Sequence, residues 1–249
     1  MNTVFGDFTL WAQVETPSHP TFEPFIERLQ PLCGVVDGVF IAEGVGGLSG
    51  LLGAVKAKEL GLTPIVHIIS RDKNRVAIFS DLVTMSALGL DKVVLSVGAH
   101  PTRSPVSAAK PVYDLDVFQM LQLVQDISQG RDLVGQSMGR GSTLSAGVVS
   151  NLRADLELEL VSLHQKSRMG AAFVLLLPSE ALDRIEQVVK EVDIPVIASV
   201  AADGRPATDM ASWIETLRRT GIRGVNVVLT PGQERVTVEA LSRVRRAVP

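Results

Sequence analysis

Continuous apolar runs alternate with amphipathic segments along the whole chain. The run Val35–Ala42 is too continuously apolar for a strand of a sheet that meets water on one face, so we expect both of its faces to be covered. Further along, Val76, Phe79, Val83 and Leu90 follow helical spacing, which places one apolar stripe on a helix. The pattern therefore predicts buried strands, each followed by a helix that packs on the sheet.

This alternation recurs to the end of the chain. The expected strands are Thr9–Val14, Val35–Ala42, Pro64–Ile69, Lys92–Val97, Leu144–Val149, Ala172–Leu177, Pro195–Val200 and Gly224–Leu229. The expected helices are Pro24–Leu29, Leu51–Leu60, the segment with the stripe Val76–Leu90, Asp114–Ser128, Arg153–Arg168, Ser179–Val192, Thr208–Arg219 and Gln233–Val248. Eight strands alternating with eight helices predict an α/β protein with a (β/α)8 TIM barrel fold. We expect residues 1–249 to form this barrel as a single domain.

Composition narrows the class of partner. The 249 residues are 46% hydrophobic and carry a net charge of -3, with basic residues scattered along the chain. This excludes the footprint of a nucleic-acid-binding protein or of a polybasic membrane patch. The single cysteine, Cys33, excludes an intramolecular disulfide and fits a reducing compartment. Because no signal peptide or membrane-spanning segment is evident, we expect a soluble cytoplasmic protein.

Residues that follow the strands are the first candidates for chemistry, because a TIM barrel builds its active site there. Glu15 ends the first strand, so it either donates a proton to a substrate or is an ordinary solvated or salt-bridged carboxylate. Arg71 and Asp72 follow the third strand and either pair with each other or anchor a phosphate group. The loop Gly98–Pro111 holds three prolines, and loops of this length are usually functional or disordered.

Other polar or glycine-rich positions have ordinary structural interpretations. His67 lies in an aliphatic strand, where a hydrogen-bonded core histidine is more common than a ligand. The glycines of the segment 44–50 join a strand to a helix, but Ser49 stands where a dinucleotide-binding motif needs glycine, which favours a tight turn. No pair of histidines or cysteines has metal-ligand spacing, so we expect no metal site.

Four short segments share a pattern with a known family. Residues 67–74 read H-I-I-S-R-D-K-N, and residues 112–116 read V-Y-D-L-D. Glu15-Thr16-Pro17 looks like an E-x-P-P segment, and Lys166, Gly170, Ala171 and Phe173 look like the segment K-x-x-A-G-A-x-F. With these motifs the chain resembles the methylenetetrahydrofolate reductase family, particularly its short bacterial members, over most of the chain from Glu15 to about Val200.

The resemblance implies a TIM barrel that binds FAD and reduces 5,10-methylenetetrahydrofolate to 5-methyltetrahydrofolate with NAD(P)H, or catalyses the reverse oxidation. It implies that Glu15 is the catalytic acid. It also implies that the flavin is contacted by His67, Arg71, Asp72, Ser96, Val97, Gly98, Ala99, Tyr113, Glu159 and Lys166. The folate would be contacted by Glu15, Ala99, His100 and Leu177.

Two departures from the family pattern lie on the substrate side. Ala99 stands where the family has an aspartate near the flavin and the pterin, and Leu177 stands where it has a folate-binding glutamine. A lost charged hydrogen bond typically weakens binding ten- to hundredfold, at about 1.5–3 kcal/mol. Two alternatives therefore remain open: a flavin-free folate-binding protein of methyl transfer, and a non-catalytic partner subunit. A homo-oligomer is also compatible with the sequence.

Overall fold

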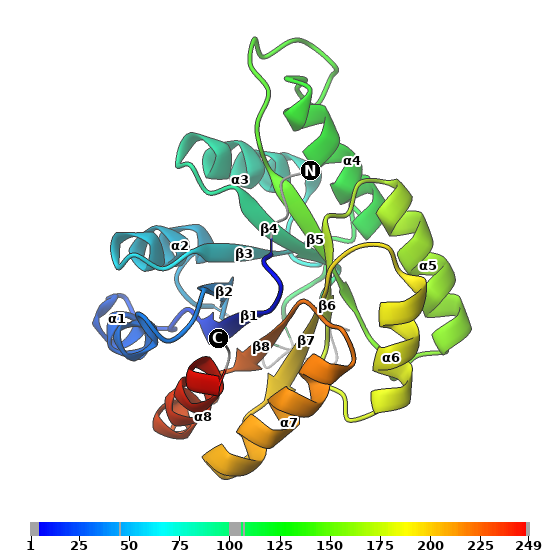
Figure 1. Cartoon of the computed structure of the whole chain (residues 1–249). Helices are drawn as coiled ribbons and strands as arrows, with labels where there is room; N and C mark the ends of the chain where they lie inside the picture. Colours follow the sequence, from blue (N-terminus) through cyan, green and yellow to red (C-terminus); the bar gives the residue numbers. More distant parts are fainter. Residues whose placement is uncertain (1–4, 45, 100–105, 107, 248–249) are drawn as a thin grey trace.

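The computed structural model describes residues 5–44, 46–99, 106 and 108–247 and confirms the predicted (β/α)8 barrel (Figure 1). Its parallel strands pair in chain order, and β8 closes the barrel on β1. The strands are β1 (Thr9–Glu15), β2 (Gly38–Ala42), β3 (Pro64–Ile69), β4 (Lys92–Ser96), β5 (Ser145–Ser150), β6 (Phe173–Leu176), β7 (Val196–Ala201) and β8 (Gly224–Val228).

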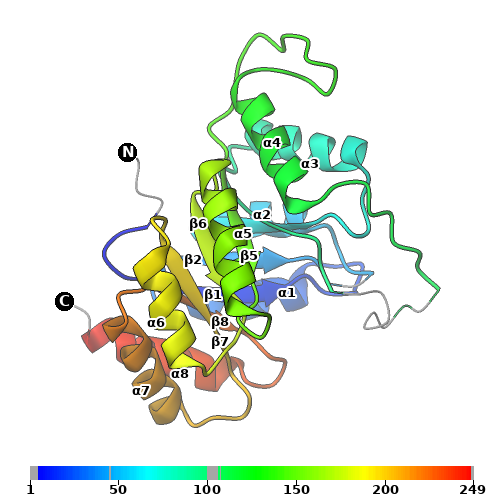
Figure 2. The same ribbon diagram turned by 90° about the vertical axis from the view of Figure 1, so that its right-hand side faces the viewer.

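Helices follow the strands and lie along the outside of the barrel, as the view turned by 90° shows (Figure 2). They are α1 (Glu23–Leu29), the 3-10 turn η1 (Gln30–Leu32), α2 (Gly50–Glu59), α3 (Arg75–Ala87), α4 (Val117–Ser128), α5 (Leu156–Arg168), α6 (Leu182–Glu191), α7 (Ala207–Arg219) and α8 (Glu234–Ala247). Among the described residues, no helix is long and apolar enough to cross a membrane.

Several elements begin later than the apolar pattern predicted, because local hydrogen bonds set their starts. The second strand begins at Gly38 rather than Val35, since the amides of Val35 and Val36 donate to Leu32 O and close a turn after η1. The helix expected from Asp114 begins at Val117, because Asp116 is its N-cap. A side-chain cap fixes backbone geometry outside the helix, so the residue that carries it cannot be helical itself.

The interior of the barrel, toward the amino-terminal ends of the strands, is filled by aromatic and aliphatic side chains. Phe5 packs edge-to-face on Trp11 and Phe173, with ring centroids 5.4 and 5.0 Å apart. Gly147 makes room for this cluster, since a Cβ there would lie 2.2 Å from the Phe173 ring. The small residue opposite a large one lets the interior reach close packing.

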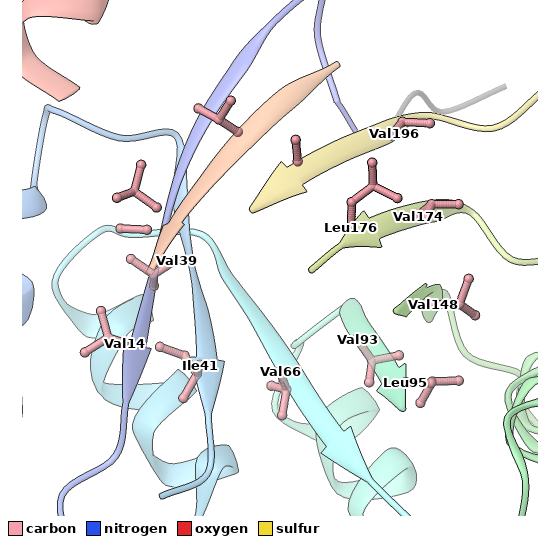
Figure 3. Packing of buried hydrophobic residues seen from close by; sticks show 14 of the residues in the cluster. Val14, Val39, Ile41, Val66, Val93, Leu95, Val148, Val174, Leu176 and Val196 are labelled. Carbon is pink, nitrogen blue, oxygen red and sulfur yellow. The ribbon is translucent and has the colours of Figure 1, made fainter. Parts of the chain in front are cut away.

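The outward faces of the strands form the main core with the helices. Figure 3 shows this layer from close by, with labelled side chains from β1 to β7 that include Val14, Ile41, Leu95 and Val196. These side chains are almost completely buried. Each strand is thus covered on both faces, inside by the barrel filling and outside by helices, which explains the continuous apolar runs of the sequence.

Candidate functional site

A polar layer lies above the aromatic filling, toward the carboxyl ends of the strands. Gln13, Ser199 and Asn226 point inward from β1, β7 and β8, and Asn226 Nδ2 donates to Gln13 Oε1 and Ser199 Oγ at 3.2 Å each. Asn226 is fully buried, and its Oδ1 has no hydrogen-bond partner among the described residues. Because buried acceptors are normally satisfied, an ordered water is the expected partner of this oxygen.

His67 belongs to the same inward layer on the other side of the barrel. Its Nε2 lies 2.8 Å from Ser96 Oγ of the neighbouring strand. Burial lowers the pKa of His67 to about 4, so the imidazole is neutral at physiological pH. This is the hydrogen-bonded interior histidine that the sequence favoured.

Glu15 is the last residue of β1 and is exposed at the carboxyl end of the barrel. Its carboxylate forms no hydrogen bond or ion pair with another described residue; only its backbone oxygen accepts, from Arg28 Nη1 at 3.5 Å. Arg28 is engaged elsewhere, with Nε 3.3 Å from Glu234 Oε1 and Nη2 donating to Leu229 O. The carboxylate of Glu15 is therefore free to meet a ligand.

Charges after β3 neutralise one another instead. Arg71 Nε donates to Asp72 Oδ1 at 2.8 Å, and Arg71 Nη1 donates to Ala99 O at 2.9 Å. The hydrogen bond from Arg71 lowers the pKa of Asp72. Of the two alternatives that the sequence left open for this pair, mutual pairing is the one observed.

Lys73 forms a second ion-paired cluster beside the first. It lies 2.9 Å from Glu43 Oε2 and 3.0 Å from Asp81 Oδ2. Burial acts to lower the pKa of Lys73, but hydrogen bonds to these two carboxylates outweigh burial and raise it. The cluster ties the end of β2 to α3, which is a structural role.

The glycine segment after β2 is the predicted tight turn. Gly47 N donates to Gly44 O at 2.8 Å, and a Cβ on Gly44 would lie 2.4 Å from Thr16 O. Thr16, fully enclosed, accepts from Gly44 N and donates its hydroxyl to Leu48 O at 2.6 Å. The Glu15-Thr16-Pro17 segment therefore holds two loops together and fixes the position of Glu15.

Other residues predicted for the site lie in different places. Glu159 and Lys166 face each other on α5 at 3.8 Å. Lys166 is buried near the end of that helix, which runs back from the carboxyl end of β5, so it lies away from the barrel mouth. Leu177 is exposed directly after β6. That these residues contact a ligand stays a prediction.

The loop after β4 is only partly described. Val97 is half-buried, while Gly98 has a φ of 88° and Ala99 is exposed. Tyr113 is exposed with a φ of 49°, beside Val112, whose amide donates to Arg71 O at 2.7 Å. His100 lies outside the described residues.

A pocket of about 280 Å³ opens at the carboxyl ends of β5, β6 and β7 and includes Ser199 of the polar layer. Larger hollows of about 750 and 700 Å³ lie at the opposite end, against Asp91 and Ser142, which precede β4 and β5, and against Pro195 and Arg223, which precede β7 and β8. We place the candidate site at the carboxyl end, because that is where barrels of this class carry out chemistry and where the inward layer is polar.

The sequence interpretation missed Gln13, Ser199, Asn226 and the charged residues of this pocket. A usable signal existed for Ser199 and Asn226, because each is a polar residue inside an apolar strand, as His67 is. Their inward direction follows from the two-residue period of a strand. What no local pattern could give was that they bond to each other across β7 and β8.

Fold and site together define a (β/α)8 barrel with a polar mouth. No protein-family model and no curated protein matches the sequence. Similar solved structures include tryptophan synthase from M. tuberculosis, at 14% identity over 96% of this chain and 93% of that chain, with a TM-score of 0.63. A mutant tryptophan synthase α-subunit from Pyrococcus furiosus has 13% identity over 98% and 97%, with a TM-score of 0.64. At this identity the similarity establishes the fold alone.

The comparisons overturn the resemblance to methylenetetrahydrofolate reductase. The similar solved structures named above are tryptophan synthase chains, and no family-level match supports the reductase. The assignment as a flavin-dependent folate reductase was wrong. FAD, NAD(P)H and the tetrahydrofolate substrate, together with the flavin-free methyl-transfer alternative, are withdrawn with it.

The residues that suggested the reductase have physical roles of their own. Asn74 caps α3, with Oδ1 accepting from Ala77 N at 3.0 Å. Asp116 forms a capping box with Gln119 at the start of α4. Such caps are the common way to start a helix, so the same letters at the same spacing recur without a shared ligand.

Proposed function

We propose that this protein is an enzyme that acts on a small polar molecule at the carboxyl end of its barrel, with Glu15 transferring a proton. The observation that carries the proposal is the carboxylate of Glu15 at the mouth, which pairs with no described residue, whereas Arg71, Asp72 and Lys73 after β3 are paired. A carboxyl group that is fixed in position and has no internal partner can reach a proton on a bound substrate.

The polar layer supports the same proposal. Gln13 lies two residues before Glu15 on the inward face of β1, and it accepts a hydrogen bond from Asn226. A substrate bound over this layer would meet the half-buried amide of Gln13, which Asn226 holds in place. Gln13 would orient the substrate, and Glu15 would give or take the proton.

The test is a comparison of substrate-depletion profiles. Purified protein is incubated with a metabolite extract, and mass spectrometry identifies compounds consumed and formed by the wild type. Glu15→Gln keeps the shape of the side chain and removes its proton transfer, so we expect turnover to fall on the order of 10²–10⁴-fold. Glu27→Gln, on the exposed surface of α1, is the matched control and keeps wild-type turnover. Equal turnover by Glu15→Gln, or no compound consumed by the wild type, would refute the proposal.

The expected homo-oligomer or partner subunit stays a prediction. One of the similar structures is of the tryptophan synthase α2β2 complex from Pyrococcus furiosus, at 13% identity and a TM-score of 0.62. Light scattering on the purified chain measures its mass directly, and the mass of a monomer would refute the predicted homo-oligomer.

A further inference from the structure

The pocket after β5, β6 and β7 contains charges of both signs. Arg153, Glu180, Asp203 and Arg205 line it, so its formal charge is zero. Arg205 and Glu180 form an ion pair that joins the loop after β7 to the loop after β6. This pair closes one wall of the pocket and removes two of the four charges from any contact with a ligand.

The other two charges have no partner. Among the described residues, the guanidinium of Arg153 and the carboxylate of Asp203 take part in no hydrogen bond or ion pair, and no ion pair joins them to each other. The pocket therefore offers one free cation and one free anion on separate strand-end loops. Neither an anion nor a cation alone would be complementary to such a pocket, because each would bring its charge beside a like charge.

Short turns fix the backbone of both residues. Arg153 N donates to Asn151 Oδ1 at 3.1 Å in the turn after β5. Asp203 and Gly204 have φ values of 36° and 70° in a turn closed by Arg205 N donating to Ala202 O at 2.9 Å. Asp-Gly is a favoured pair for a turn with two positive φ angles. The turns therefore fix the points on the backbone from which the two side chains extend.

Between the charges the pocket supplies a polar and an aromatic surface. Ser199, which is 4% exposed, accepts from Asn226 with its Oγ, so its own proton remains to be donated. Trp213 contributes a half-buried indole from α7. An aromatic face attracts a cation as well as apolar groups.

We propose that this pocket binds a small zwitterion, an α-amino acid, with its carboxylate on Arg153 and its ammonium group on Asp203. Guanidinium–carboxylate pairing is the geometry that Arg provides best. A volume of about 280 Å³ suits a single small metabolite. The inference rests on the proposed function and names its substrate class, since hydrogen bonds through Ser199, Asn226 and Gln13 connect the pocket with the strand that carries Glu15.

Binding of single compounds to the full chain tests the proposal. Isothermal titration with each common L-α-amino acid is compared with titration of its carboxylate-only and amine-only analogues. We expect at least one amino acid to bind with a Kd on the order of 1 mM or tighter, and both of its analogues to bind at least about tenfold more weakly. No amino acid binding, or a carboxylate-only analogue that binds as tightly as the amino acid, would overturn the proposal.

Two variants separate the two ends of the ligand. Arg153→Gln is expected to weaken binding of the amino acid about ten- to hundredfold and to leave binding of the amine-only analogue unchanged. Asp203→Asn is expected to weaken binding of the amino acid by a similar factor and to leave binding of the carboxylate-only analogue unchanged. Arg168→Gln, at the exposed end of α5, is the matched control and binds as the wild type. Circular dichroism verifies that each variant is folded. Wild-type affinity in both pocket variants would show that these charges are only solvated surface groups and would overturn the proposal.

Titration of Glu15→Gln distinguishes this proposal from the proposed function. The variant should bind the amino acid as the wild type does while losing turnover. Binding together with unchanged turnover would refute the role of Glu15 and keep the pocket. Turnover of another compound with no amino acid binding would refute the pocket and keep the enzyme.

Discussion

His67 inside the barrel should make the protein less stable in mild acid. Its pKa falls from 6.5 to about 4 because burial disfavours the imidazolium form. The unfolded chain therefore binds a proton below about pH 6.5, whereas the folded chain does not until about pH 4. Between these values the unfolded state holds more protons, so the free energy of unfolding decreases as the pH falls.

The size of the effect follows from the same pKa difference. One pKa unit is worth about 1.4 kcal/mol, so His67 costs about 2 kcal/mol of stability at about pH 5 and about 3 kcal/mol once the pH is below 4. Above about pH 6.5 this cost is absent, because His67 is neutral in both the folded and the unfolded chain. Because the His67 residue keeps part of its surface accessible, we expect the measured loss to lie at or below these figures.

Urea unfolding at about pH 7.5 and about pH 5 measures this loss, with Trp11 and Trp213 as fluorescence probes. His67→Gln keeps a polar group near Ser96 but has no titrating ring. The wild type should lose about 2 kcal/mol more than this variant between the two pH values. His19→Gln, an exposed replacement, should behave as the wild type. Equal losses in the wild type and His67→Gln would refute the reasoning.

Two further predictions concern the fold. Gly147→Ala should lower the free energy of unfolding in urea by about 1–3 kcal/mol, because its Cβ would lie 2.2 Å from the Phe173 ring. Gly6→Ala is the control and should change this free energy little, since nothing lies within 4 Å of its Cβ. Equal effects of the two substitutions would contradict the packing argument. Asp116→Ala removes the capping box with Gln119 and should cost about 0.5–2 kcal/mol without changing amino acid binding, whereas Asp116→Asn should restore most of the stability. A loss of binding in a folded Asp116→Ala protein would contradict the purely structural role.

The architecture could be predicted because its determinants are local. The continuous apolar run of each strand and the helical character of the segment after the third strand show in any short window of sequence. The stripe expected on that helix was partly wrong, because α3 buries Ile78, Leu82 and Met85 while Val76 is 62% exposed. Even the boundary errors were local in origin. Asp116 and the amides after Leu32 move element ends by a few residues, because caps and turns compete with the regular ladder for hydrogen bonds.

The family resemblance failed for a physical reason. Asn74, Asp114 and Asp116 match the reductase motifs, but here they start helices or pair with a neighbour: Asp114 lies 2.7 Å from Arg75. Helix starts after barrel strands need these residue types whatever the ligand. Short motifs composed of caps and ion pairs therefore report the fold more strongly than the chemistry.

The sequence by itself determined the strands, the helices and the positions that meet at the carboxyl end of the barrel, including Glu15. Only the tertiary structure decided which charges remain available there. Arg71 pairs with Asp72, Arg205 pairs with Glu180, and Arg153 and Asp203 have no partner among the described residues. Pairing depends on distances of a few ångströms between loops that are tens of residues apart in the chain, and sequence separation carries no information about those distances.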